Sequence, residues 1–313
     1  MSWRPPPPSV AIASADAAPM LDAEDLVLRL TVPPEFDTGP TLAGRVRGAL
    51  GEALRTQRED ELRLNARRRG LWGTPPAFDV FFADPPVFPP REGPLAAAPA
   101  RPYVLFTECR RPEVTVTLRV FGHGRQWLPM LRRALETAIT RQGLSVMPLA
   151  RSRARFPDCD LILRRPETPA ALPDHTDVRL VALSPWHLDR NGWIALDARM
   201  IANSAISRAA GVLAWCGCWL DGDPAEIEEE LRRLHSTDST LTHREDPRRS
   251  NRQDLTLLQG GLQGAVTLRH VGTSLRALLP IIPLTGLGSG TTAGFGRSAT
   301  FCEIATPLAH RQA

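Results

Sequence analysis

The sequence predicts an α+β fold, and three observations carry this prediction. Runs of β-branched and aliphatic residues alternate with amphipathic helical runs in two successive blocks. The chain has 313 residues, of which 42% are hydrophobic, so it can form the cores of two ordinary domains. Strands that alternate with helices in two blocks favour two tandem ferredoxin-like (RRM-like) domains, followed by a C-terminal glycine-rich loop.

The first block predicts an N-terminal ferredoxin-like domain over residues 23–105. Residues 1–22 are rich in Pro, Ala and Ser and are expected to form a flexible tail. Residues 26–32 alternate as a strand, and residues 41–69 form an arginine-rich helix with apolar residues on one face. Residues 78–82 are predicted to form a strand, and the proline-dense residues 83–102 a connection.

The second block predicts a C-terminal ferredoxin-like domain over residues 106–313. A strand at 114–121 and an amphipathic helix at 126–141 open it. The remaining predicted strands are 144–149, 161–164, 178–183, 255–258 and 264–270, and the remaining predicted helices are 197–219 and 223–233. A helical insertion is expected near 220–250, and a glycine-rich loop at 286–297 precedes the last strand.

Charge and cysteine content limit the class of protein. The net charge is +4 and the pI about 9.1, and all 38 basic residues are Arg because the chain contains no Lys. Guanidinium groups bind phosphates bidentately and stack on bases, but a GC-rich genome also explains the excess of Arg. Five irregularly spaced cysteines do not form a disulfide framework, and Cys216-Gly217-Cys218 is expected to continue a buried helix. No secretion signal or membrane span is present, which predicts a cytoplasmic protein.

The glycine-rich loop is the strongest motif. Residues 286–297 contain five glycines, three hydroxyl side chains and Arg297. Such a loop can bind a polyphosphate through its amides. No lysine is present for a Walker loop, and the third glycine falls one place early for a dinucleotide fingerprint. The segment therefore indicates either a nucleic-acid contact or a plain turn between strands.

Clusters of arginine indicate where RNA would bind, although each cluster also fits an ordinary solvated surface. RNA helices are recognised through phosphates, 2′-hydroxyls and shape. The predicted RNA-binding residues are Arg67, Arg68, Arg69, Arg151, Arg153, Arg155, Arg244, Arg248, Arg249, Ser250, Arg252, Gln253, Gly288, Ser289, Gly290, Thr291 and Arg297.

Four segments, in order, resemble the Cas-six group of CRISPR RNA-processing endoribonucleases of the RAMP superfamily. They are residues 39–51, residues 118–122 with 127–131 and 143–144, residues 248–253 with 260–264, and the glycine loop ending in Gly294-Phe295-Gly296-Arg297. The resemblance implies an enzyme that needs no metal or cofactor. It would bind the hairpin of a CRISPR repeat and cleave the RNA through attack of a ribose 2′-OH, leaving a 2′,3′-cyclic phosphate.

The resemblance also implies partners and leaves one alternative open. The expected partners are CRISPR repeat RNA, mature crRNA and other subunits of a CRISPR effector complex. The alternative is a catalytically inactive RAMP subunit that caps crRNA in such a complex. A ferredoxin-like protein unrelated to CRISPR is the third interpretation.

The chain departs from the family at the general base, which the family often takes from a histidine near the first helix. Residues 1–122 contain no histidine, and the first helix carries arginines instead. We therefore predict an arginine-assisted site with Arg45, Arg47, Arg55 and Arg58, as in a divergent branch such as type IV. These arginines could equally hold only the RNA backbone. His123, between two glycines, is the rival catalytic candidate.

Overall fold

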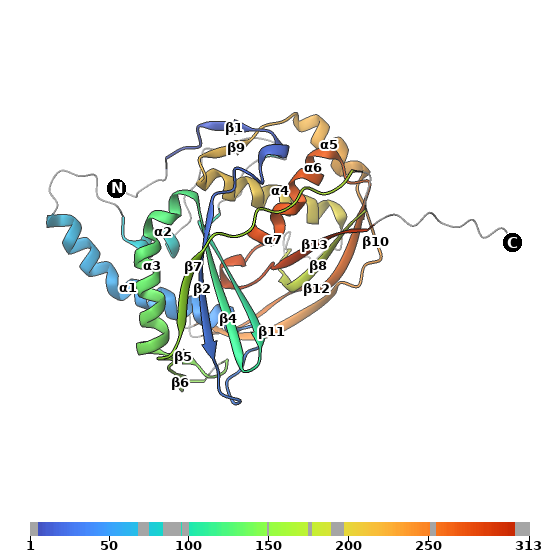
Figure 1. Ribbon diagram of the computed structural model, residues 1–313. Coiled ribbons are helices and arrows are strands. Elements are labelled where there is room, and N and C mark those ends of the chain that lie inside the picture. The colour runs from blue at the N-terminus through green and yellow to red at the C-terminus, as the bar shows by residue number, and fades with distance from the viewer. Residues whose placement is uncertain are drawn as a thin grey trace.

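A computed structural model of the chain describes residues 6–67, 75–83, 95, 100–148, 150–174, 177–188, 197–250 and 255–303. Two mixed units, each a sheet with helices packed on it, lie side by side (Figure 1). The predicted α+β class is confirmed.

The first unit is built on a four-stranded antiparallel sheet in the order β3-β4-β2-β7. Its elements in chain order are β2 (Ala23–Thr31), α1 (Leu42–Arg67), α2 (Ala77–Phe81), β3 (Tyr103–Arg110), β4 (Glu113–Phe121), α3 (Leu128–Thr137) and β7 (Asp160–Arg164). A short hairpin, β5 (Leu144–Ser145) and β6 (Arg153–Ala154), is inserted before β7. Apart from α2 and this hairpin, the sequence of elements is that of a ferredoxin-like unit.

Alternation of side chains explains how this sheet is covered. Leu26, Leu28 and Leu30 on β2 point into the core, where they meet α1 and α3, and Leu26 lies opposite Leu118 of β4. Helix α1 contributes Leu42, Val46, Leu50 and Leu54 to the same core. The spacing of these four residues matches the helical repeat, so the long helix is held by packing at its N-terminal half.

The second unit contains a five-stranded sheet in the order β10-β12-β8-β13, with β11 also paired to β12. Its elements are β8 (Asp177–Trp186), α4 (Ala198–Trp215), β9 (Cys218–Leu220), α5 (Pro224–Arg233), β10 (His235–Thr237), β11 (Thr242–Ser250), β12 (Leu255–Arg269), α6 (Thr273–Leu278), α7 (Ile282–Thr285) and β13 (Ser298–Glu303). Short helical turns, η2 (Gly122–Trp127), η3 (Ala138–Gln142), η4 (Leu279–Ile281) and η5 (Thr291–Ala293), join elements in both units.

The strand pairing differs from the predicted domain boundary at residues 105/106. Strands β3 and β4 form a hairpin that pairs with β2, so the first sheet continues to Arg164 and the second begins at Asp177. The difference arises because β3, which follows the proline-dense stretch, was not expected as a strand. The strand at 114–121 is therefore the third strand of the first unit, where the sequence predicted the first strand of the second.

Several local predictions were wrong. Residues 78–82 lie in and directly after helix α2, which begins after Pro76. Cys216-Gly217-Cys218 leaves α4: Gly217 has φ of 79° and Cys218 begins β9. The expected helical insertion near 220–250 contains α5 but continues as strands β10 and β11.

The expected flexible tail is packed where the structure describes it. Strand β1 (Val10–Ile12) pairs in parallel with β9, and the turn η1 (Ser14–Asp16) follows. Ile12 and Ala17 are buried in the core of the second unit. The N-terminal segment is therefore part of the second unit's core.

A buried arginine, Arg119, connects the two units. Arg119 of β4 donates to both carboxylate oxygens of Asp25, at 2.7 and 3.0 Å, and to the carbonyl of Leu284 at 3.2 Å. Leu284 lies in α7, directly before the glycine-rich loop. None of the helices in the described part of the chain is long and apolar enough to span a bilayer.

Candidate functional site

The glycine-rich loop at 286–297 is a folded connection between α7 and β13. All five of its glycines have φ between 73° and 92°, a region that other residues rarely occupy. At Gly296 a Cβ atom would lie 2.0 Å from the carbonyl oxygen of Leu287. The glycine content therefore follows first from the backbone conformation of the loop.

Two elements of the second unit hold this loop. The Ser204 hydroxyl of α4 accepts a hydrogen bond from the Gly288 amide at 2.9 Å. At the end of β8, the carbonyl of His187 accepts one from the Ser289 amide, and the carbonyl of Pro185 accepts one from the Gly296 amide. The side chain of Arg208, one turn after Ser204, donates to the carbonyl of Thr285 at 2.9 Å. These contacts fix the loop at both ends.

Because the loop is folded, fewer of its backbone amides are free to bind a ligand than the sequence predicted. Most of its amides donate within the protein, among them that of Gly288, which was predicted to bind RNA. Within the described residues, the amides of Gly290, Thr291 and Thr292 have no acceptor. The Ser289 side chain is exposed, whereas Thr291 is buried. The loop itself therefore offers a ligand three adjacent amides and the hydroxyls of Ser289 and Thr292.

The loop packs against the first unit at the start of α1. A Cβ atom on Gly294 would lie only 2.1 Å from the Cβ atom of Ala43, so glycine is required for this approach. We call this contact between the loop and the first unit the seam. Arg297 also crosses it, because it donates to the carbonyl of Thr107 at 3.3 Å and forms an ion pair with Glu108, both on β3. Segments about 250 residues apart in sequence thus meet at one place.

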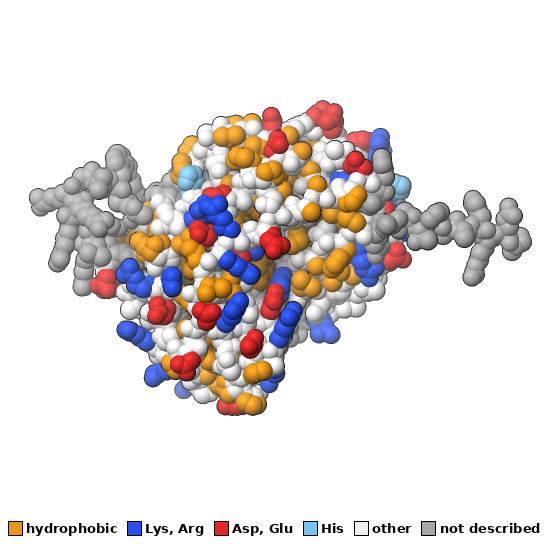
Figure 2. Space-filling model, viewed as in Figure 1, with side chains coloured by type: hydrophobic (Ala, Val, Ile, Leu, Met, Phe, Trp, Pro, Cys, Tyr) orange, Lys and Arg blue, Asp and Glu red, His pale blue; other side chains and the backbone are white. Residues whose placement is uncertain are grey.

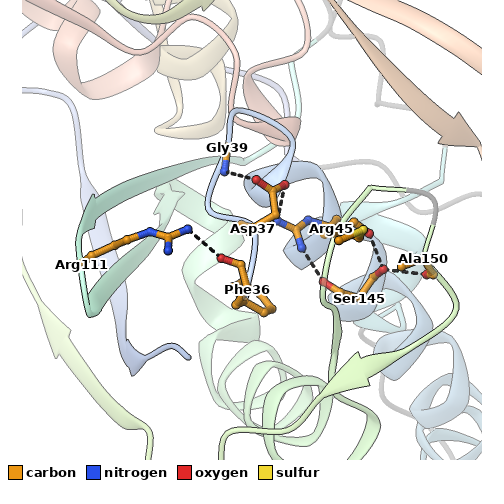
Figure 3. A network of polar contacts seen from close by, with 8 residues as sticks. Phe36, Asp37, Gly39, Arg45, Arg111, Ser145 and Ala150 are labelled. Atoms are coloured by element: carbon orange, nitrogen blue, oxygen red, sulfur yellow. Dashed lines mark hydrogen bonds and ion pairs between the residues drawn. The ribbon is translucent and has the colours of Figure 1, made fainter. Parts of the chain in front are cut away.

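Arg45 is part of the fold of the first unit (Figure 3). Its guanidinium group donates to the backbone carbonyls of Asp37 and Ser145, pairs with the Asp37 carboxylate at 3.2 Å and lies over the ring of Phe36. Burial lowers the pKa of Arg45, and the charge of Asp37 opposes this shift. The guanidinium is therefore committed to holding the start of α1 to the β5–β6 hairpin.

The other predicted arginines of α1 do not converge with Arg45. Arg58 lies 13 residues further along, roughly 20 Å by helix rise, and pairs with Asp79 of α2 at 2.8 Å. Hydrogen bonding to Asp79 raises the pKa of Arg58. Arg55 is exposed. The predicted set is therefore spread over one helix and does not form a single cluster.

Arg47 is the predicted arginine that shares a helix face with the loop contact. It follows Ala43 by four residues, so their side chains are neighbours on the helix surface. Its guanidinium lies 5.0 Å from the centre of the Phe82 ring, and its Nε is buried with no partner in the described part of the protein. Among the described residues, Arg47 thus has no carboxylate partner, and it lies one helical turn after Ala43, the residue that Gly294 contacts.

His123 lies at the other end of the first sheet. It follows β4 at Phe121, whereas the contact of Arg297 is at Glu108, which pairs with Thr115. Six residues of strand, roughly 20 Å, separate these positions. His123 is exposed, and a Cβ atom on Gly217, in the turn after α4, would lie 3.9 Å from its Nε2.

Sequence reasoning missed His187. This half-buried residue directly follows β8, its carbonyl accepts a hydrogen bond from the Ser289 amide at 3.0 Å, and its ring centre lies 6.5 Å from that of Phe295. Its backbone also lies against Gly261, one of the glycine pair on β12. Only strand pairing brings the end of β8 to the loop, and no motif around His187 signals it.

The remaining predicted RNA-binding residues are distributed over both units. Arg151, Arg153 and Arg155 are exposed around β6, and Arg153 pairs with Glu52 of α1 at 3.2 Å. Arg244 is exposed on β11, whose backbone also carries Arg248, Arg249 and Ser250. Arg67 ends α1, and Arg68, Arg69, Arg252 and Gln253 lie outside the described residues. On the face shown in Figure 2, arginines alternate with acidic side chains and do not form a continuous basic stripe.

Metal binding has no obvious centre in the part of the chain that the structure describes. No group of three His, Cys, Asp or Glu side chains is arranged there to hold an ion. The groups at the seam are a cation, amides, hydroxyls and an imidazole, which can bind a phosphodiester and move protons.

Comparisons with known proteins gave structural similarity only. No protein-family model matches the chain, and no curated protein matches it. The chain is similar to a Cas6 product complex, with 16% identity, a TM-score of 0.49 and coverage of 90% of this chain and 100% of that chain. It is also similar to Thermus thermophilus Cas6, with 14% identity, a TM-score of 0.48 and coverage of 90% and 99%. The product of a Cas6-related gene from Pyrococcus furiosus gives 9% identity, a TM-score of 0.42 and coverage of 90% and 98%.

Proposed function

We propose that the protein is a metal-independent endoribonuclease that binds the hairpin of CRISPR repeat RNA and cleaves it to mature crRNA. The contact between Gly294 and Ala43 carries this proposal. It joins two of the four segments whose sequence resembles the Cas-six group, the first-helix segment and the glycine loop. A third segment, with the glycine pair on β12, lies against His187, which holds the loop.

The groups at the seam suit attack of a ribose 2′-OH on the adjacent phosphate. Arg47 supplies a cation for the charge that develops on the phosphorane, and the amides of residues 290–292 supply donors. His187 is the assigned proton acceptor, because a neutral imidazole can take the 2′-OH proton near neutral pH. We assign Arg45, Arg55 and Arg58 to stabilising the fold or to binding the RNA backbone. His123 is assigned neither of these roles.

The test is single-turnover cleavage of repeat transcripts from the source genome, with EDTA present. Cleavage should leave a 2′,3′-cyclic phosphate and should stop when the scissile nucleotide carries a 2′-deoxyribose. Arg47→Gln should lower the rate by about 10²-fold or more while binding persists. Arg232→Gln, in an exposed pair with Glu229, is the matched control and should not change the rate.

The pH dependence tests the proton acceptor. The wild-type rate should rise with pH, because a general base accepts a proton only in its deprotonated form. His187→Ala should be slower and should lose this rise. An unchanged pH profile in His187→Ala would remove His187 from the mechanism.

A second function is favoured by the pairing of the helix arginines. Because Arg45 and Arg58 are held by Asp37 and Asp79, the protein could bind and cap crRNA in an effector complex without cleaving it. Tight binding of repeat RNA that stays intact through many hours in EDTA would select this function. Retention of the cut RNA and contacts with other effector subunits are compatible with both.

A further inference from the structure

A second site lies on α1, on a face different from the one that meets the glycine loop. A cavity of about 370 Å³ lies between the N-terminal half of α1 and the β5–β6 hairpin. The helix lines it with Thr41, Gly44, Arg45, Gly48, Ala49 and Glu52, a set that does not include Ala43 or Arg47. Its volume falls in the range of small-molecule sites.

The wall of this cavity contains buried donors without acceptors. The Arg45 side chain is only 10% exposed, and its Nε is buried without a partner in the described residues (Figure 3). The Thr41 hydroxyl is buried and unpartnered in the same sense. An unsatisfied buried polar group costs about 1–3 kcal/mol, so this wall is not arranged for stability alone.

The wall is also held rigidly. Arg45 is fixed by Asp37 and by the carbonyl of Ser145, whose hydroxyl lies 2.7 and 2.8 Å from the carbonyl oxygens of Met147 and Ala150 and can donate to either. These contacts hold the connection between β5 and β6, which lines the cavity. A cavity whose donors are positioned before binding loses little entropy when a ligand enters.

The rim is basic and partly apolar. Arg151 and Arg153 are exposed at it; Arg153 pairs with Glu52, the single lining carboxylate, and Arg45 pairs with Asp37, so Arg151 is the lining guanidinium without a carboxylate partner among the described residues. Met147 is 50% exposed and adds an apolar surface against which a base can lie. Gly48 leaves open space, since a Cβ atom there would have no neighbour within 4 Å.

We propose that this cavity binds one unpaired ribonucleotide of the RNA. Its phosphate would lie between Arg151 and Arg153, and its base would lie against Met147. Unpaired bases are the parts of an RNA that a protein can take into a pocket. The inference rests on the proposed function for its source of RNA, and it adds a contact to single-stranded RNA beside the hairpin.

The experiment compares three probes by equilibrium binding: a fluorescein-labelled pentaribonucleotide, uridine 5′-monophosphate and a blunt repeat stem-loop without unpaired ends. Gly48→Leu fills the open space from an exposed helix position and replaces a poor helix former. We expect it to weaken pentaribonucleotide binding at least tenfold and to leave stem-loop affinity within twofold. Arg153→Gln, a surface change that does not threaten folding, should also weaken the pentaribonucleotide, and Arg199→Gln on α4 should not.

The outcomes separate the two proposals. Equal pentaribonucleotide affinity in wild type and both cavity variants, or no binding by wild type, overturns the cavity site. Uridine monophosphate bound as tightly as the pentaribonucleotide assigns the cavity to a free nucleotide and overturns the RNA assignment. A wild type that ignores the stem-loop but binds the pentaribonucleotide through Gly48 and Arg153 supports the cavity and contradicts the hairpin-processing function.

Discussion

At the scale of single residues, the same side-chain type has different roles along one helix. Arg45 is buried and supplies hydrogen bonds to two backbone carbonyls, whereas Arg55, three turns later, is exposed. Sequence alone assigned both to one catalytic group, because spacing on a helix does not tell which face is covered. Burial and partners, which only the tertiary structure determines, distinguish a structural arginine from a free one.

Arg45→Met should destabilise the protein by about 2–3 kcal/mol, because the Ser145 carbonyl loses its donor and Asp37 loses its buried cation. Arg55→Met is the control on the same helix and should stay within about 0.5 kcal/mol. Urea unfolding followed by circular dichroism measures both. Equal midpoints for the two variants would show that the Arg45 network contributes nothing to stability.

The free cysteines should differ in reactivity. Burial raises the pKa of Cys216 to about 12, so at pH 8 only about one thiol in 10⁴ is the reactive thiolate. Cys109 and Cys302 are exposed. With iodoacetamide at pH 8, peptide mass spectrometry should find Cys109 and Cys302 alkylated well before Cys216. Labelling of Cys216 at the same rate would mean that the pKa of its thiol is not raised.

At the scale of elements, the sequence predicted those whose period is long and regular. The helix at 41–69 and the strand at 26–32 show enough repeats to fix their type, and both are found as α1 and β2. Residues 78–82 are too few to distinguish the two periods, and packing of Phe82 against Gly51 and Arg47 selects a helix. Strand β11 was missed because it carries charges and Pro247, as an edge strand can.

The glycine loop shows what local sequence could and could not reveal. Its composition predicted an unusual backbone, and all five glycines do have positive φ. Four of its amides, those of Gly288, Ser289, Gly296 and Arg297, have acceptors in α4 or at residues 184–187, about 80 to 110 residues away in sequence, so the sequence could not show that these amides are unavailable to a ligand. For the same reason the position of His187 beside the loop could not be predicted before the fold was known.

The same change, from glycine to alanine, at two different positions tests the role of the loop. Gly294→Ala adds a methyl group at φ of 92° and 2.1 Å from Ala43, so the loop must move away from α1. We expect a lower melting temperature and at least tenfold slower cleavage. Gly48→Ala meets nothing within 4 Å and should be neutral or stabilise by up to about 1 kcal/mol. If Gly294→Ala behaves like Gly48→Ala in thermal unfolding and cleavage, the seam is not needed for activity.

At the scale of the whole molecule, the two units share one continuous interface. Arg119 joins β2 and β4 of the first unit to α7 of the second, and Arg297 joins β13 to β3. Both guanidinium groups lie about 6 Å from the centre of the Phe106 ring. The glycine loop is therefore positioned by contacts from both units, and its place depends on their docking.

Asp25→Asn should uncouple this docking. Asp25 is fully buried, and without its charge the 9% exposed guanidinium of Arg119 keeps no buried anion, which typically costs about 3–5 kcal/mol. Because Arg119 also holds Leu284, two residues before the loop, hydrogen exchange should rise at the amides of Leu287 and Gly288. Arg29→Gln is the control on the same strand: its pair with Asp160 spans 3.9 Å between side chains about 60% exposed, so it should cost less than about 1 kcal/mol. Urea unfolding and hydrogen exchange that fail to distinguish the two variants would contradict a seam held by the Asp25–Arg119 pair.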